Sequence, residues 1–97
     1  MPVGIKKYRL TEHALFEMKR RGIIKEDIEK VLANPEQVIK VREERVVFQS
    51  RVERGKSSRI YLLRIFVDMD RQPAEVVTAY YTTKTDKYWS KNHEGDL

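Results

Sequence analysis

The sequence lacks cysteine, has only two histidines and four scattered glycines, and contains no long hydrophobic run. Without cysteine there can be no disulfide framework, thiolate nucleophile or zinc–sulfur site. The separated histidines form no metal ligand set, and the glycines form no phosphate-binding loop. The longest apolar stretch, residues 60–67, contains Arg64 and is far too short to span a membrane. We therefore expect no metal, no cofactor and no membrane partner.

Length and composition indicate one globular domain. Ninety-seven residues allow a single core, and 40% apolar with 36% charged residues is typical of a folded chain with a charged surface. We expect one domain over residues 1–97, with an ordered core at about 6–90 and a frayed polar tail at 91–97. The N-terminus lacks the apolar run of a signal peptide, and the lack of cysteine suits a reducing compartment, so we expect a cytoplasmic protein.

Positive charge is concentrated in the middle of the chain. Residues 37–66 carry eight Lys and Arg against three Asp and Glu, which equals the net charge of +5 for the whole chain. A local basic excess is the pattern expected of a polyanion binder, although +5 is also an ordinary value for a soluble domain. The distribution favours a nucleic acid as partner.

The hydrophobic periodicity predicts an α+β domain. A short strand at residues 6–10 precedes a helix that begins at Thr11 as N-cap and ends at Gly22, and a second helix covers 25–32. Strand-like segments follow at 37–41, 45–52, 59–68 and 74–83. Short connections between consecutive strands favour an antiparallel meander. We expect two helices packed on one face of a four-stranded antiparallel meander, with the other face open.

His13 is the first candidate catalytic residue, because imidazole readily moves a proton near neutral pH. It lies one helical turn before Glu17, and Arg20 and Arg21 follow about one turn later. Cleavage of a phosphate ester needs a base and cations that stabilise the charged transition state. The structural alternative, which we favour here, is that His13 caps or packs and that Glu17 and Arg21 form an ordinary surface pair.

Arginines on the predicted strands form a second candidate site, which comprises Arg45, Arg51, Arg59 and Arg64 set among Gln49, Tyr61 and Tyr80. Guanidinium groups and aromatic rings on an open sheet face can pair with phosphates and stack on bases. Alternation along the strand places Arg59 and Arg64 on opposite faces. Arg64, in the most apolar strand, is either paired inside the protein or directed to a ligand, and both alternatives stay open.

A third cluster follows the last strand, where Tyr80, Lys84, Lys87 and Tyr88 bring hydroxyl and ammonium groups together. Such groups suit a phosphate or a phosphorylated substrate. The alternative is an edge strand protected by polar and cationic side chains, and we favour it slightly.

Several short motifs resemble those of one prokaryotic family. They are residues 11–14 (Thr-Glu-His-Ala), Met18, 21–23 (Arg-Gly-Ile), 34–36 (Asn-Pro-Glu), 82–84 and 87–89. Over residues 8–90 the chain is identified as a member of the domain of unknown function 4258, which resembles the RelE/ParE- and BrnT-type toxins. The resemblance implies a compact α+β fold related to toxins of toxin–antitoxin pairs, several of which cleave RNA without a metal. Glu17 stands where the family often has arginine, which weakens a cationic helix face.

We therefore predict a toxin-like, metal-independent ribonuclease or RNA-binding domain with a RelE/ParE-like fold. The predicted catalytic residues are His13, Arg64 and Tyr88. The predicted nucleic-acid-binding residues are Arg20, Arg21, Arg45, Arg51, Tyr80, Lys84 and Lys87. RNA, including ribosome-associated mRNA, is the expected partner. The alternative is a non-catalytic protein-interaction module that binds a co-encoded antitoxin-like protein, and the sequence leaves the oligomeric state open, a homodimer included.

Overall fold

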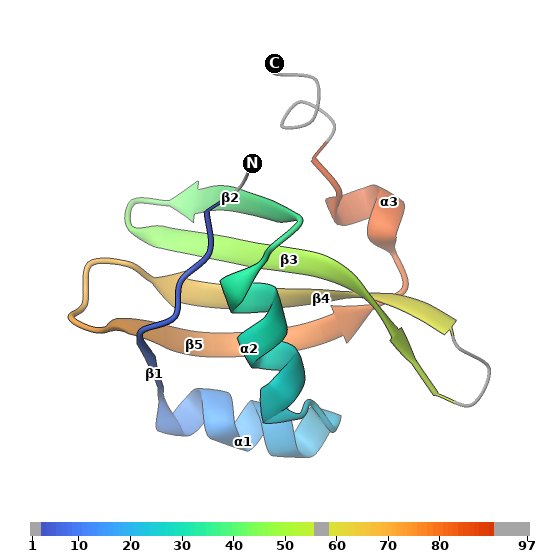
Figure 1. Cartoon of the computed structure of the whole chain (residues 1–97), viewed down its shortest axis with the longest axis horizontal. Helices are drawn as coiled ribbons and strands as arrows, with labels where there is room; N and C mark the ends of the chain where they lie inside the picture. Colours follow the sequence, from blue (N-terminus) through green and yellow to red (C-terminus); the bar gives the residue numbers. More distant parts are fainter. Residues whose placement is uncertain (1–2, 56–58, 91–97) are drawn as a thin grey trace.

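The polypeptide forms one mixed sheet with three helices, as seen in the computed structural model, which describes residues 3–55 and 59–90. The elements are β1 (Tyr8–Leu10), α1 (Glu12–Arg21), α2 (Lys25–Ala33), β2 (Gln37–Arg42), β3 (Arg45–Arg54), β4 (Arg59–Asp68), β5 (Ala74–Thr82) and α3 (Thr85–Tyr88). The strand order is β1-β5-β4-β3-β2 (Figure 1). The predicted tail at 91–97 lies outside the described residues.

The α+β class is confirmed, but the sheet as a whole has five strands and is mixed, whereas we expected a four-stranded antiparallel meander. Strands β2 to β5 pair antiparallel with their neighbours, and β1 adds a fifth strand that pairs parallel with β5. Parallel pairing needs a long crossover between the two strands, and here all the elements from α1 to β4 lie between β1 and β5. The sheet is therefore mixed.

The predicted boundaries of α1 follow from its two caps. The hydroxyl of Thr11 accepts a hydrogen bond from the Ala14 amide at 3.1 Å, and Gly22 ends the helix in the left-handed region at φ 68°. Glycine adopts this conformation without steric cost. Within the described part of the chain, no helix has the length and apolar character needed to cross a bilayer.

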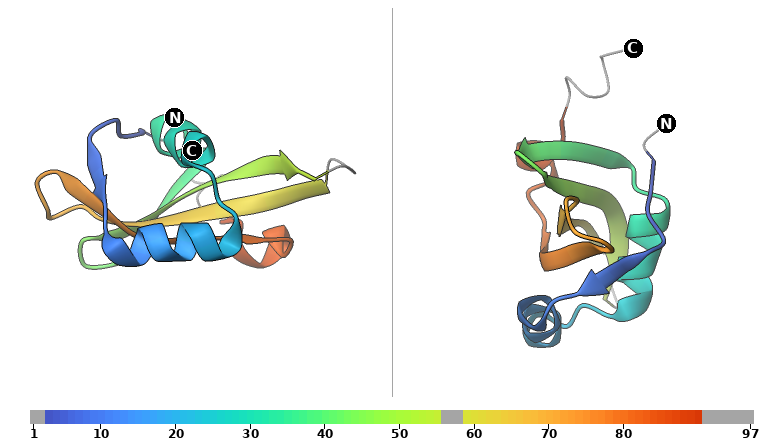
Figure 2. Two further views of the ribbon diagram at one scale, coloured as in Figure 1. Left: turned by 90° about the horizontal axis from the view of Figure 1, so that it is seen from below. Right: turned by 90° about the vertical axis from the view of Figure 1, so that its left-hand side faces the viewer.

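The helices take three different positions around the sheet. Figure 2 shows α2 over one face and α3 over the opposite face, while α1 lies along β5. Thr11, at the start of α1, donates from its amide and hydroxyl to the Val76 carbonyl at 3.1 and 3.0 Å, and Arg21, at its end, donates to the Ala79 carbonyl at 2.8 Å. Thr11 and Arg21, one at each end of α1, thus hold the helix against β5. The expected pair of helices on one face is replaced by one helix on the face and one along the edge.

The hydrophobic core lies between α2 and the sheet, and α1 closes it. Its members, each at most 5% exposed, include Ala14, Met18, Ile28, Val31, Leu32, Phe48, Leu63, Ile65, Val67 and Val76. Burial of a Leu, Ile or Phe side chain contributes about 1.5–3 kcal/mol, so this cluster holds the sheet and helices together. Because side chains alternate along a strand, the strand neighbours of these core residues point to the face that carries α3.

Candidate functional site

One row of polar side chains crosses the sheet on the face that carries α3, called the α3 face below. Gln37 on β2 is paired with Gln49 on β3, Gln49 with Arg64 on β4, and Arg64 with Tyr80 on β5. We call these four residues the cross-strand row. Antiparallel register places directly paired side chains about 5 Å apart on the same face, so the four groups are in reach of one another.

Hydrogen bonds join each member of the cross-strand row to the next. The Gln49 amide nitrogen donates to the Gln37 side-chain oxygen at 2.8 Å. Arg64 donates from Nε to the Gln49 side-chain oxygen at 2.9 Å and from Nη1 to the Tyr80 hydroxyl at 2.7 Å. Gln37 and Gln49 are 1% and 0% exposed, so their amides depend on these bonds to offset the cost of burial. The network therefore fixes the orientation of Arg64.

The two glutamines also hold α3 against the sheet. The Gln49 amide donates to the Tyr88 carbonyl at 3.1 Å, while Gln37 both donates to the Ser90 carbonyl at 3.0 Å and accepts from the Ser90 amide at 3.1 Å. A four-residue helix has little stability of its own, so α3 depends on such tertiary contacts. Helix α3 was not predicted, because the sequence shows in its residues only a polar and cationic cluster after the last strand.

Among the described residues, no carboxylate pairs with the positive charge of Arg64. Its side chain is half-buried, and its guanidinium carbon lies 4.2 Å from the centre of the Tyr88 ring and 5.3 Å from that of Phe66. In residues 3–55 and 59–90, no Asp or Glu oxygen lies within 4.0 Å of it. Its hydrogen-bond partners, Gln49 and Tyr80, are neutral. A fixed guanidinium with unpaired charge favours an anion, for which its planar donors are well shaped.

Tyr88 places a phenol with unusual acidity beside Arg64. A hydrogen bond with Tyr80 lowers the pKa of the Tyr88 hydroxyl, and the positive charges of Lys87 and Arg64 lower it further. The Tyr80 and Tyr88 rings meet edge to face, with centres 6.3 Å apart, and the Lys87 ammonium lies 5.3 Å from the Tyr88 ring. A phenol with a lowered pKa is present as phenolate to a larger extent at a given pH, and the phenolate is the form that accepts a proton.

The fold thus brings together four of the predicted site residues, which are Arg64, Tyr80, Lys87 and Tyr88. Two further predicted residues lie beside them. Lys84 is exposed directly before α3, and the Arg21 guanidinium lies 5.9 Å from the centre of the Tyr80 ring. Positive groups from α1, β4 and α3 therefore surround one pair of tyrosines.

Arg51 also lies on the α3 face, but a carboxylate offsets its charge. It forms an ion pair with Glu36 at 2.8 Å and stacks over the ring of Trp89, with its guanidinium carbon 4.5 Å from the ring centre. It stabilises the segment after α3 and takes a smaller part in attracting an anion.

Other predicted residues lie away from this cluster. His13 is exposed near the start of α1, and its distance from Arg21 along the helix is about 12 Å at 1.5 Å per residue. Arg20 forms an ion pair with Glu17 at 2.6 Å. Of the two predicted proton-transfer candidates, His13 and Tyr88, Tyr88 lies beside Arg64.

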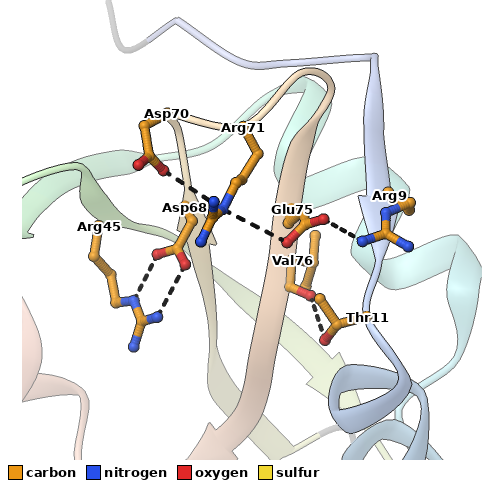
Figure 3. A network of polar contacts seen from close by, with 8 residues as sticks. All are labelled: Arg9, Thr11, Arg45, Asp68, Asp70, Arg71, Glu75 and Val76. Atoms are coloured by element: carbon orange, nitrogen blue, oxygen red, sulfur yellow. Dashed lines mark hydrogen bonds and ion pairs between the residues drawn. The ribbon is translucent and has the colours of Figure 1, made fainter.

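Arg45 lies at another part of the sheet, where β3 begins. Figure 3 shows its guanidinium facing the Asp68 carboxylate, with hydrogen bonds at 2.8 and 3.0 Å. Arg71, also drawn there, lies between Asp70 and Glu75, and Glu75 pairs in turn with Arg9. Arg45 is four residues before Gln49, roughly 13 Å along an extended strand. It belongs to a charge network of the turn region, separate from Arg64.

In the sequence, Gln49 stood out only as a neighbour of the strand arginines, and Gln37 and Arg54 were missed as parts of this region. The sequence held one signal for Gln49: it is an uncharged polar residue that directly follows the apolar Val47 and Phe48 within a predicted strand. Such a residue needs hydrogen-bond partners when it is buried. Among the described residues, no group of three or more His, Asp or Glu is placed to hold a metal ion.

Comparison with known proteins matches one family. The model of the family described as Domain of unknown function (DUF4258) matches residues 10–81, which is more than half of the chain. No curated protein and no solved structure matches the chain. The matched range includes the whole cross-strand row and ends before α3 begins at Thr85.

Proposed function

The chain belongs to the DUF4258 family, and we propose that it is a toxin-like RNA-binding domain that cleaves single-stranded RNA without a metal. The observation that carries the proposal is Arg64, a half-buried guanidinium with only neutral partners, fixed beside two tyrosine hydroxyls. The toxin-like part of the proposal rests on the resemblance of residues 8–90 to the RelE/ParE- and BrnT-type toxins.

Binding of RNA would centre on a phosphate at Arg64. The guanidinium of Arg64 is the fixed cation, and Lys84 and Lys87 are exposed cations on neighbouring positions. Phosphate contacts of this kind supply most of the affinity for single strands, and the face of an aromatic ring such as that of Tyr80 or Tyr88 is a surface on which an unpaired base would stack. Arg21 adds positive charge from the side of α1.

Cleavage would use the ribose 2′-hydroxyl as nucleophile. Tyr88 in its phenolate form takes the proton of the 2′-hydroxyl, the 2′-oxygen attacks the adjacent phosphorus, and the bond from phosphorus to the 5′-oxygen breaks. The leaving 5′-oxygen takes a proton from water, which leaves a 2′,3′-cyclic phosphate and a 5′-hydroxyl. Arg64 stabilises the charge that develops on the non-bridging oxygens. Removal of one such charge-stabilising group typically costs about 100- to 1,000-fold in rate.

The test is incubation of the purified protein with single-stranded RNA in excess EDTA. We expect fragments with cyclic phosphate ends, and Arg64→Gln should slow their formation by about 100-fold or more. Arg71→Gln is the matched control, because it removes one arginine from an exposed turn whose ion pairs are long, at 3.9 Å. Intact RNA after long incubation would exclude cleavage. A protein that immobilised RNA does not retain even at low salt would exclude binding.

A second candidate function is the non-catalytic interaction module, and a groove beside α1 and α2 favours it. A groove of about 470 Å³ lies between β1, α1 and α2, and its lining includes Leu10, Leu15 and Ile28. Leu15 and its neighbour Phe16 are 47% and 63% exposed, an apolar surface suited to a helix or strand of another protein. A co-encoded antitoxin-like protein is the expected partner. Co-purification that Phe16→Ser abolishes, together with no RNA binding, would favour this candidate.

A further inference from the structure

A second groove lies at the C-terminal end of β5. Its volume is about 450 Å³, and it is lined by Arg21, Arg54, Tyr80 and Tyr81. Tyr80 and Tyr81 are consecutive residues of β5, so their side chains point to opposite faces of the sheet. A groove lined by both residues therefore extends around the edge of β5. The part lined by Tyr80 lies on the α3 face.

Main-chain carbonyls hold both arginines of the groove in place. Arg21 donates to the Ala79 carbonyl at 2.8 Å, and Arg54 donates from Nη2 to the Gly22 carbonyl at 3.0 Å. The Arg54 guanidinium also lies over the Tyr81 ring, 4.2 Å from its centre. Each arginine spends only part of its five donors on these contacts, so others remain for a ligand.

The charge of the groove is positive. Arg21 shares the Glu17 carboxylate at 2.8 Å with Arg20. Arg54 is half-buried and, over the described ranges 3–55 and 59–90, has no Asp or Glu oxygen within 4.0 Å. Within the described residues, Arg54 therefore resembles Arg64: each guanidinium is held by neutral hydrogen-bond acceptors and has no carboxylate partner.

Tyr80 links the two sites. The guanidinium carbons of Arg64 and Arg21 lie 5.8 and 5.9 Å from the centre of its ring, so they are at most about 12 Å apart. One or two nucleotides of an extended single strand cover such a distance. An RNA strand with a phosphate at Arg64 can therefore continue past Tyr80 into the groove.

We propose that the groove lined by Arg21, Arg54, Tyr80 and Tyr81 is a second subsite, which binds the nucleotide adjacent to the one at Arg64 in the same RNA strand. The inference rests on the proposed function and narrows its substrate class. The strand has to be unpaired, because a base that enters a groove around a sheet edge cannot stay stacked in an A-form duplex. Arg54 binds the phosphate of this nucleotide, and the substrate spans at least two nucleotides.

The test is a fluorescence anisotropy titration with a labelled eight-nucleotide single-stranded RNA at several salt concentrations. Arg54→Gln should weaken binding roughly 10-fold and lower the salt slope by about 1, because one phosphate contact is lost. Arg54→Lys, which keeps the charge, should keep the salt slope. Arg71→Gln should match the wild type in both respects. The same RNA annealed into a duplex should bind more weakly than the single strand.

The outcomes separate the subsite from the proposed function. If Arg64→Gln weakens binding while Arg54→Gln binds like Arg71→Gln, the subsite is refuted and the proposed function stands. If the wild type binds no RNA, the proposed function fails and the subsite with it. Circular dichroism checks that each variant is folded.

Chemical modification of the wild-type protein tests the subsite without any substitution, and so does not depend on whether Arg54→Gln folds. Phenylglyoxal modifies accessible arginines, and mass spectrometry locates the modified residues. Bound RNA should protect Arg54 and Arg64 and leave Arg71 reactive. Equal modification of Arg54 with and without RNA would overturn the assignment.

Discussion

Replacement of Gln49 by leucine should destabilise the domain and release α3 from the sheet. Gln49 is 0% exposed, and its amide makes three hydrogen bonds, to Gln37, to the Tyr88 carbonyl and from Arg64. Leucine has a similar volume, so the substitution removes these bonds without a large cavity. The effect therefore reports on the hydrogen-bond network itself.

The expected loss in the free energy of unfolding follows from the polar groups that lose their hydrogen-bond partners. The Tyr88 carbonyl and the Nε–H of Arg64 lose Gln49, whereas the Gln37 side-chain oxygen keeps the Ser90 amide at 3.1 Å. A buried group left without a partner costs about 1–3 kcal/mol. Arg64 is only half-buried, and water meets part of its need, so we expect a loss of about 2–3 kcal/mol. At this chain length each kcal/mol lowers Tm by about 4–8 °C, so Tm should fall by roughly 10–20 °C.

Urea denaturation followed by two signals measures both effects. Far-UV circular dichroism reports the free energy of unfolding of the whole domain. Trp89 is the single tryptophan of the chain and directly follows α3, so its fluorescence reports the docking of α3. In Gln49→Leu we expect a red-shifted emission before the dichroism changes. In the wild type the two transitions should coincide.

Gln37→Leu and the double variant complete a double-mutant cycle. If the two glutamines act as one network, the double variant should lose less stability than both single variants together, with a coupling of about 0.5–3 kcal/mol. A Gln49→Leu protein whose stability lies within about 0.5 kcal/mol of the wild type, with unchanged Trp89 fluorescence, would refute the reasoning.

Two further predictions concern tyrosines. The cleavage rate should rise with pH as Tyr88 ionises and level off below about pH 10, because Tyr80, Lys87 and Arg64 lower its pKa; a pH–rate profile unchanged in Tyr88→Phe would contradict this role. Tyr81→Phe removes a 2.9 Å hydrogen bond from β5 to a carboxylate on α2, so the free energy of unfolding should fall by about 1–2 kcal/mol.

Local features of the fold could be predicted from the sequence because their causes lie within a few residues. Thr11 and Gly22 set the ends of α1 through cap contacts with Ala14, Met18 and Lys19. The nearly continuous apolar run within residues 59–68 predicted β4 with the bounds that the structure has. Such signals predicted the α+β class and the positions of most elements.

The positions of charges could be predicted less well, because each arginine has a partner on another element. Arg45 and Arg64 both stand on predicted strands, but antiparallel register pairs Arg45 with Asp68 and Arg64 with the neutral Gln49. The sequence alone indicated a basic segment. The register of the sheet decides which arginine keeps an unpaired charge.

By itself the sequence determined an α+β domain with a basic middle segment, and it placed Arg64 in the most apolar strand. Only the tertiary structure decided that β1 joins β5, that α3 docks on the sheet, and that Arg64 meets Tyr80 and Tyr88. The reason is sequence distance. The bonds that hold α3 join positions 39 to 53 residues apart, and a four-residue helix has no local signal strong enough to reveal it.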